Sequence, residues 1–539
     1  MIRRGCAEGD MITKDKLYRW VILIALVFLI PALACNFPVP TKRSDTSFGE
    51  LHMTLTALAN STSSEQTLVP MGGKTPATPS AGGDITATQP GPIVSPLRTP
   101  GQDGSGTQLI YFTQNGDTLP AVAKRFGVKP EQASSSQTLP SEGLLPPGLE
   151  LLIPNILGDT QFPDFLLPDS EIIYSPSTTD FEIAEFINDA GGYLSTYTEV
   201  VNGNLISGVE IVQKVAAENS INPRLLLAVL EYRSGWVFGE PVDPLKIANP
   251  IGFYVPDYKG LYYELVLTAT HLGVGYYGWR TGSLISITFS DDSTVRLSPG
   301  LNVGSVALQN FFSKFSDQEE FRETLYGGDG FIHLYQQMYG DPWVRDVQAG
   351  PLFPIGLTQP DLELPFGHGE RWGFTGGPHL SWNSGSPRGA IDFSPITGEP
   401  PCTTTEAWVT ASAAGRVTRS ADNVVAIDLD GDGFEQTGWA LVYLHISEMD
   451  SIAPAEQVEV DQPLGHPSCD RGNSTGTNVH IARKYNGEWI AVEGPLPFTL
   501  SGWEVEAGQR SYQGRLIKDG QVVSANPGGP SSSVIIRED

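Results

Sequence analysis

The chain has 539 residues, several times the length of a typical domain, so we expect several domains. Its 61 Asp and Glu residues outnumber 33 Lys and Arg residues, and the net charge of −28 excludes electrostatic binding of nucleic acid and disfavours anionic lipid surfaces. Hydrophobic residues make up 40% of the chain and charged residues 17%, which is typical of globular domains joined by polar linkers.

Residues 1–35 read as a targeting segment. The basic stretch KDKLYR precedes the apolar run WVILIALVFLIPALAC, which is shorter than the roughly 20 residues of a spanning helix and ends on small residues. The final ALAC resembles a bacterial lipobox, which implies cleavage and lipidation of Cys35; an uncleaved signal anchor is the alternative. We therefore expect an extracytoplasmic protein, either lipid-anchored to the outer face of the bacterial membrane or secreted.

Residues 36–106 are dominated by Thr, Ser, Pro and Gly. Such a segment buries too little apolar surface to offset its ordering entropy, so we expect a disordered tether.

Four cysteines bear on the compartment and on cross-linking. Cys6 lies in the leader and Cys35 is the lipidation candidate, which leaves Cys402 and Cys469. Two remaining thiols of an exported protein most simply form a disulfide, whereas metal thiolates would favour CxxC spacing, which is absent.

Residues 107–155 are predicted to form a small β-α-α-β module. An alternating strand comes first, GDTLPAVAKRF has the cap and apolar face of a helix, and LELLIP closes as a strand. The runs QNGDTL, AKRFGV and LIP resemble the LysM family, although the Asn usual before the second loop is missing. The resemblance implies binding of N-acetylglucosamine chains near the first loop; a capped helix needed only for folding is the alternative. The implied glycan-binding residues are Gly116, Asp117, Thr118 and Leu119.

Residues 156–180 read as a connector, and residues 181–345 as an α-helical domain. SGVEIVQKVAAEN opens with a capping box, and NPRLLLAVLEYRSGW opens with Asn-Pro. The latter resembles the start of a lysozyme-like transglycosylase core, whose catalytic Glu immediately precedes Ser-Gly. That position here is Arg233, which cannot act as the proton donor. We expect a degenerate lysozyme-like scaffold for glycan strands, with Glu231 as the alternative acid.

Residues 352–539 are predicted to form an antiparallel all-β domain. The runs AWVTAS, GRVTRS, VVAIDLD, WALVYLHI and GTNVHIAR are separated by Gly, Asp and Asn turns. Five of the eight histidines occur in this part of the chain: His368, His379, His445, His466 and His480.

The stretch TGGPHLSWNSGSPRGAIDF places His379 and Asp392 at either end of an expected loop. Zinc hydrolases commonly use three N or O ligands and leave a fourth position to water, so these two residues and a later His would form such a set. The segments resemble the lysostaphin and LytM-type zinc endopeptidases, in particular the beta-lytic branch with its long His-to-Asp loop. The resemblance implies Zn²⁺ bound by His379, Asp392 and His480; a loop histidine bonded to backbone is the alternative for His379.

The same resemblance implies two further residues of the catalytic site. LVYLHIS corresponds to a strand with a catalytic histidine, His445, and TNVHIA corresponds to the family's His-x-His, whose first member here is Asn478. Asn donates hydrogen bonds but cannot exchange a proton near neutral pH, and loss of a general acid or base costs a factor of about 10² to 10⁴. We expect a zinc endopeptidase that cleaves peptide cross-bridges of peptidoglycan, contacting its glycan strands and stem peptides. An impaired or inactive wall-binding scaffold or activator is the alternative.

DLDGDGFEQTG matches the first half of an EF-hand calcium loop through Asp428, Asp430 and Asp432. The twelfth position is Trp439 instead of a bidentate Glu, which favours a solvated acidic turn over a calcium site.

Overall fold

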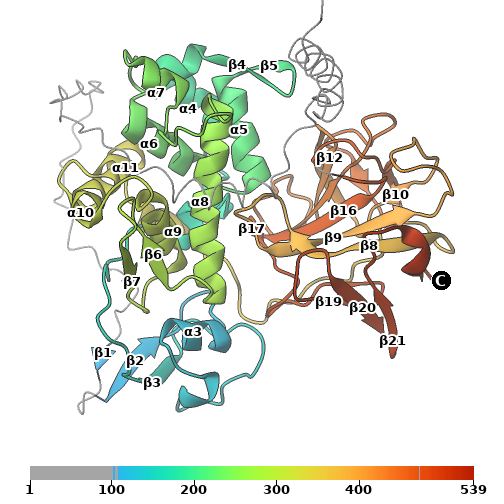
Figure 1. Ribbon diagram of the computed structural model, residues 1–539, viewed down its shortest axis with the longest axis horizontal. Coiled ribbons are helices and arrows are strands. Elements are labelled where there is room, and N and C mark those ends of the chain that lie inside the picture. The colour runs from blue at the N-terminus through green and yellow to red at the C-terminus, as the bar shows by residue number, and fades with distance from the viewer. Residues whose placement is uncertain (1–100, 103–106, 473, 539) are drawn as a thin grey trace, which may run out of the picture. The chain divides into compact units, whose positions relative to one another are not determined.

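The computed structural model describes residues 101–102, 107–472 and 474–538 (Figure 1). The predicted signal peptide with Cys35, and most of the predicted tether, lie outside the described residues. Within the described part of the chain, we find no helix with the length and apolar character needed to cross a membrane.

The first module is a three-stranded antiparallel sheet with one α-helix. β2 (Gln108–Phe112) pairs with β3 (Glu150–Pro154) and with β1 (Gly101–Gln102), so the end of the predicted tether joins the sheet. α3 (Leu119–Arg125) is capped by the Thr118 side chain. The predicted second α-helix is wrong: the structure has a single 3₁₀ turn, Pro130–Gln132, followed by a Ser-rich stretch with little helix propensity. The module's core includes Tyr111, Val122, Phe126, Leu151 and Ile153.

The middle region is mainly helical and carries two β-hairpins, β4–β5 (Thr198–Val201, Asn204–Ser207) and β6–β7 (Ser286–Thr288, Thr294–Arg296). The predicted capping box is present at the start of α5, and Leu225 to Leu230 of α6 are fully buried, which explains why that run is apolar on every side. The helices are α4 (Ile183–Ala190), α5 (Gly208–Asn219), α6 (Pro223–Ser234), α7 (Pro244–Ala248), α8 (Leu261–Thr281), α9 (Val303–Phe312), α10 (Gln318–Tyr326), α11 (Phe331–Tyr339) and α12 (Pro342–Ala349).

The C-terminal region is all-β, as predicted. Its main antiparallel sheet has the order β14-β11-β12-β13-β16-β9-β8-β22, with β17 also paired to β16. The main strands are β8 (Arg371–Leu380), β9 (Arg388–Pro395), β11 (Gly415–Ala421), β12 (Val424–Asp428), β13 (Trp439–Leu444), β14 (Gln457–Val458), β16 (Val479–Tyr485), β17 (Glu488–Trp489) and β22 (Val534–Ile536). Smaller sheets pair β10 (Val409–Thr410) with β15 (Pro463–Gly465) and join β18 (Thr499–Leu500), β19 (Trp503–Ala507), β20 (Gly514–Lys518) and β21 (Gln521–Ser524).

The loop expected between His379 and Asp392 is shorter than their spacing suggests. His379 lies in β8 and Asp392 in β9, so only residues 381–387 remain as a turn. Gly376 and Gly377 do not break the strand. A Cβ at Gly376 would overlap the Asp392 carboxylate, and one at Gly377 would lie 2.5 Å from the Gln513 backbone, so these glycines make room for close neighbours.

Two covalent and polar links bear on the C-terminal region. The predicted disulfide between Cys402 and Cys469 is confirmed, with a Cα–Cα distance of 5.2 Å. Arg280, on α8, donates to both carboxylate oxygens of Glu488 at 2.9 and 2.8 Å and to the carbonyl of Asn115 at 2.8 Å. This one buried guanidinium therefore joins the helical region to the first module and to the strand pair β16–β17.

Candidate metal centre

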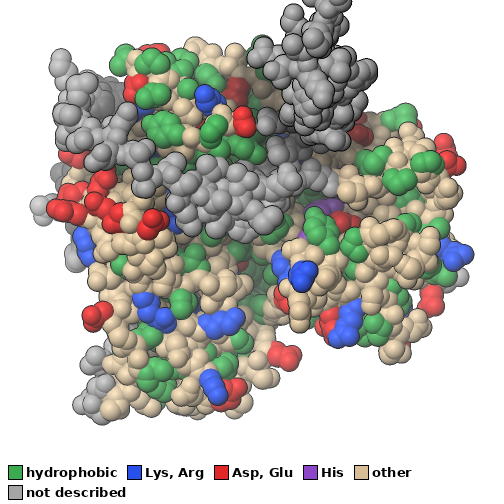
Figure 2. Space-filling view, in the orientation of Figure 1, with side chains coloured by type: hydrophobic (Ala, Val, Ile, Leu, Met, Phe, Trp, Pro, Cys, Tyr) green, Lys and Arg blue, Asp and Glu red, His purple; other side chains and the backbone are tan. Residues whose placement is uncertain are grey.

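The strand register brings the three predicted ligands to one point. His480 on β16 lies opposite Asp392 on β9, and His379 comes from the end of β8. His379 Nε2 and His480 Nδ1 are 3.0 Å apart, and Asp392 Oδ1 lies 3.3 Å from the first and 3.4 Å from the second. All three side chains are buried. Figure 2 shows one small patch of histidine beside an acidic side chain on this face of the β domain.

Backbone carbonyls fix which ring nitrogens face the centre. His379 Nδ1 lies 2.9 Å from the Gly377 carbonyl, and His480 Nε2 lies 3.1 Å from the Ser381 carbonyl. A carbonyl only accepts, so each of these nitrogens carries the proton of the neutral imidazole. The lone pairs of His379 Nε2 and His480 Nδ1 therefore point at each other and at Asp392. This is the outer-shell arrangement that orients histidine ligands of metals.

The electrostatics fit a bound cation. Asp392 Oδ1 is buried and has no hydrogen-bond donor. Burial alone would raise the pKa of Asp392, but the facing histidines hold it well below its usual range; burial would lower the pKa of His379, but Asp392 raises it. When both imidazoles are neutral, three acceptor atoms converge on one point, and two imidazoles with one carboxylate are a donor set that suits Zn²⁺.

His445 follows β13 and lies beside this centre. Its ring centroid is 6.3 Å from that of His480, and its Nδ1 lies 2.9 Å from the Asp470 carbonyl, which leaves Nε2 as the free acceptor. Its backbone adopts φ 64°, a left-handed conformation that is uncommon for a non-glycine residue and is found at functional sites. Burial lowers the pKa of His445, which favours the neutral, proton-accepting ring.

Asn478 precedes β16 and is held by the loop before it. Its Nδ2 lies 3.0 Å from Ser474 Oγ and 3.2 Å from the Gly476 carbonyl, while its Oδ1 is buried without a partner. Because the Gly476 carbonyl accepts only, the amide orientation is defined, and both contacts of Nδ2 are to the loop. In this arrangement Asn478 presents an acceptor oxygen instead of a donor.

Tyr512 also belongs to the centre and was missed from sequence. Its ring stacks on His379 with centroids 4.2 Å apart and an interplanar angle of 17°. Burial and the charge of Asp392 raise the pKa of Tyr512 to about 12, so its hydroxyl stays protonated as a potential donor. Tyr512 lies between β19 and β20, and a lone Tyr in a polar turn carries no sequence signal for this position.

Two other histidines of the region lie elsewhere. His466 Nδ1 bonds the Ala407 carbonyl at 2.8 Å and its ring packs on Trp408, while His368 lies 3.3 Å from Asp461. These contacts agree with their interpretation as loop residues.

The predicted glycan-binding loop of the first module is internal. Gly116, Asp117 and Leu119 are buried, and Thr118 caps α3. Asp117 accepts from the Tyr111 hydroxyl at 2.6 Å and pairs with Arg125. Glycan binding at these four residues stays a prediction, and their side chains already serve the fold.

Glu231, the alternative catalytic acid of the helical region, forms hydrogen bonds that hold the local fold. Glu231 Oε2 accepts from the backbone N–H groups of Val237 at 2.9 Å and Phe238 at 3.1 Å. Arg233 donates to the Ile251 carbonyl at 2.7 Å and packs over the Phe315 ring. The pair thus stabilises the segment after α6.

Asp428, Asp430 and Asp432 do converge, but their oxygens serve the turn itself. Asp428 accepts from the backbone N–H groups of Asp430 at 3.1 Å and Gly433 at 2.7 Å. The contacts agree with a hydrogen-bonded acidic turn.

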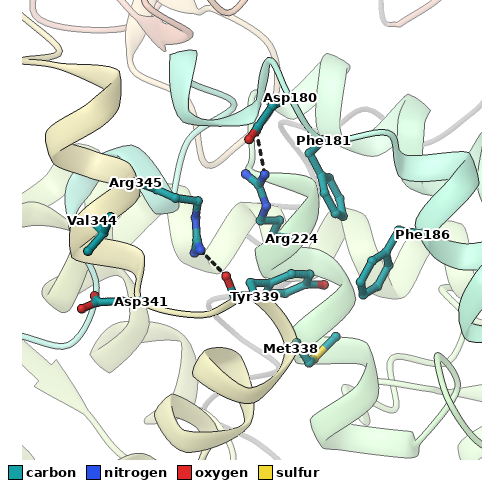
Figure 3. Close-up of a pocket in the computed structure, with 9 residues that line it drawn as sticks. All are labelled: Asp180, Phe181, Phe186, Arg224, Met338, Tyr339, Asp341, Val344 and Arg345. Carbon is teal, nitrogen blue, oxygen red and sulfur yellow. Dashed lines mark hydrogen bonds and ion pairs between the residues drawn. The ribbon is translucent and has the colours of Figure 1, made fainter. Parts of the chain in front are cut away.

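A cavity of about 480 Å³ in the helical region lies among aromatic side chains (Figure 3). Phe181 and Phe186 face Tyr339, and Arg224 lies over the Phe181 ring while pairing with Asp180 at 2.8 Å. Its guanidinium is thus neutralised, and the cavity offers aromatic faces beside the exposed carboxylate of Asp341.

Comparison with known proteins agrees with the geometry. An antiparallel sheet that brings two imidazoles and one carboxylate together has the site of a β-sheet metallohydrolase. Over 180 residues the chain is 30% identical to the beta-lytic metalloendopeptidase of Lysobacter enzymogenes, which covers 31% of this chain and 92% of that relative. The chain belongs to the beta-lytic metalloendopeptidase family and is an M23/LytM-type peptidase by that membership.

Other similarities extend beyond the β domain. The chain is 24% identical over 387 residues to Protease LasA of Pseudomonas aeruginosa (strain UCBPP-PA14), covering 66% of this chain and 82% of that relative. Residues 165–352 match the family model described as LasA, N-terminal domain. Among solved structures, the M23 metalloprotease pseudoalterin is 22% identical with a TM-score of 0.26, over 31% of this chain and 96% of the other. The LysM and lysozyme-like resemblances stay predictions.

Proposed function

We propose that this chain is an exported zinc metalloendopeptidase that hydrolyses peptide cross-bridges of the bacterial cell wall. One observation supports the metal site most strongly: a nitrogen of His379, a nitrogen of His480 and a carboxylate oxygen of Asp392, all on buried side chains, lie within 3.4 Å of one another. Family membership supports peptide hydrolysis, and the sequence resemblance supports peptidoglycan as the substrate.

The chain's own residues would divide the chemistry as follows. Zinc, when bound by the three ligands, supplies a Lewis acid that lowers the pKa of water. His445, held through Nδ1 by the Asp470 carbonyl, offers Nε2 to accept a proton from the attacking water. Tyr512 keeps a protonated hydroxyl beside His379, where it can donate to the oxygen that becomes negative. Asn478 offers only an acceptor oxygen and no proton transfer.

Export and wall attachment form part of the proposal. The leader and Cys35 support an extracytoplasmic protein, anchored by lipid or released, and the acidic composition suits contact with peptidoglycan better than with nucleic acid. The first module and the helical region would contribute contacts to glycan strands.

Asn478 favours a second candidate function, a wall-binding scaffold or activator with impaired turnover. Its Nδ2 is engaged by the loop, so neither proton exchange nor donation to an oxyanion is available there. Zinc binding is compatible with both candidate functions. A measurement of peptide cleavage distinguishes the peptidase from the scaffold or activator.

The test is the zinc content of the purified full-length chain, measured by elemental mass spectrometry after removal of free metal. We expect about one zinc per chain, lost in His379→Ala. His333→Ala is the matched control, because His333 lies exposed on α11 and its ring forms a hydrogen bond with Gln337, far along the chain from the three proposed ligands. A wild-type chain without zinc, or full zinc content in His379→Ala, would contradict the proposed metal site.

A further inference from the structure

A cavity of about 700 Å³ lies away from the metal ligands, between the first module and the end of the helical region. Gln114 and Asn115 line it on one side and Asp169, Asn302, Trp343 and Asp346 on the other. This volume is within the range of cavities that hold small molecules or peptide side chains.

The described residues that line the cavity include two carboxylates, Asp169 and Asp346, and no Lys, Arg or His. Arg280 is not among the residues that line the cavity. Its Nη2 atom lies 3.6 Å from Asp169 Oδ2 and forms a shorter ion pair with Glu488 Oε2 at 2.8 Å. The lining is therefore short of positive charge, which disfavours an anionic occupant.

The amide donors of the lining are already engaged in the fold. Each side-chain NH₂ group donates to a protein carbonyl or carboxylate: Gln114 to Gly300 O at 2.7 Å, Asn115 to Phe353 O at 2.7 Å, and Asn302 to Leu167 O at 2.7 Å and Asp169 Oδ1 at 2.9 Å.

Acceptors, in contrast, remain open. Gln114 is only 7% exposed, and while its Nε2 is fixed by Gly300, its Oε1 takes part in none of the hydrogen bonds among the described residues. Asp346 accepts from the Ser170 hydroxyl through Oδ1 at 2.6 Å, which leaves Oδ2 available. An acceptor that lines a cavity and receives no hydrogen bond from the protein can receive one from a ligand, so the cavity suits a ligand that donates hydrogen bonds.

The raised pKa of Asp346 agrees with the lack of positive charge in this cavity. Burial, with the negative charges of Asp169 and Glu171, raises the pKa of Asp346 to about 6. A nearby cation would favour its ionised form. Trp343, half-buried at the same cavity, adds an aromatic surface that attracts cations and packs against aliphatic chains.

We propose that this cavity binds a primary ammonium group on an aliphatic stem, such as the side chain of a lysyl residue in a peptide. The ammonium donates to Asp346 Oδ2 and Gln114 Oε1, and the stem packs on Trp343. The site goes beyond the proposed peptidase function, because it needs neither zinc nor the residues of the metal centre.

The test is calorimetric titration of the full-length chain with Nα-acetyl-L-lysine amide, checked by ligand-observed NMR. We expect binding that weakens at least about tenfold in Asp346→Asn and in Trp343→Leu. Asp189→Asn removes an exposed carboxylate on α4 and is the matched control, expected to bind as the wild type does. His379→Ala should also bind normally, which keeps this test separate from the metal site.

The chemical selectivity of the probe is equally decisive. Nα,Nε-diacetyl-L-lysine amide keeps the stem but lacks the charge, so it should not bind at the same concentrations. Equal binding of the two probes, no binding of the free amine to a folded wild type, or wild-type affinity in Asp346→Asn or Trp343→Leu would overturn the proposal. Binding of an N-acetylglucosamine tetramer in place of the amine would overturn it as well and would assign the cavity to a saccharide.

Discussion

Asn478 is the residue whose substitution most directly separates catalysis from binding. Replacing it by His supplies a group that exchanges protons near neutral pH, so Asn478→His should raise the rate of cross-bridge cleavage, by up to about 10² to 10⁴. The measurement is release of new amino groups from purified peptidoglycan at equal zinc content. Asn478→Gln, which keeps the amide, should not raise the rate. An unchanged rate in zinc-loaded Asn478→His would favour the scaffold.

Residue chemistry predicts which three side chains converge, but it does not predict the groups that surround and orient them. His379, Asp392 and His480 are of the types that bind zinc, and the structure brings all three together. The Ser381 carbonyl that orients His480 could not be predicted, because every residue carries a carbonyl and only the folded turn brings this one to the ring. Tyr512 likewise reaches His379 through contacts between separate sheets.

At the scale of elements, short β-rich runs between turn residues predict strands but not their order. The runs at 415–420, 424–430 and 439–446 correspond to β11, β12 and β13. Pairing of β16 with β9 links segments about 90 residues apart, and such long-range register is not encoded in local periodicity. The two glycines of β8 read as turn residues for the same reason, since the neighbours that require them come from elsewhere.

A charge cluster formed by Glu435, Arg419 of β11 and Lys484 of β16 should make the free energy of unfolding decrease at acid pH. Burial alone would raise the pKa of Glu435, but the charges of Arg419 and Lys484 lower it from 4.5 to about 2. A depressed carboxyl pKa stabilises the fold above the unfolded value, and that contribution, on the order of 3 kcal/mol, is lost as pH falls from about 4.5 towards 2.

Glu435→Gln should therefore lower the melting temperature at pH 6, because it leaves the buried Lys484 and the partly buried Arg419 short of a partner. It should also flatten the decrease in melting temperature between pH 6 and pH 3, which scanning calorimetry measures. Glu448→Gln alters an exposed carboxylate and is the control. Equal slopes for wild type and Glu435→Gln would show that this cluster does not set the acid stability.

At the scale of the whole molecule, helix α5 contacts both loops that orient the metal centre. Glu218 accepts from Arg471 at 2.6 Å, next to the Asp470 carbonyl that holds His445. The following residue of the helix, Asn219, accepts from Asn383 in the 381–387 turn, whose first carbonyl holds His480. The helical region thus restrains the loops whose carbonyls, those of Asp470 and Ser381, hold the rings of His445 and His480.

Glu218→Lys tests this coupling, because it replaces an ion pair with a repulsion between the introduced ammonium group and Arg471 at a largely buried contact. We expect faster amide hydrogen exchange in residues 466–472 and 381–387, measured by mass spectrometry, with exchange in β12 and β13 unchanged. Glu210→Gln lies on the same helix and alters its exposed N-terminal capping box, so exchange in both loops should stay at the wild-type rate. Unchanged exchange in Glu218→Lys would mean that the loops hold their carbonyls without the helix, and that the β domain alone defines the metal centre.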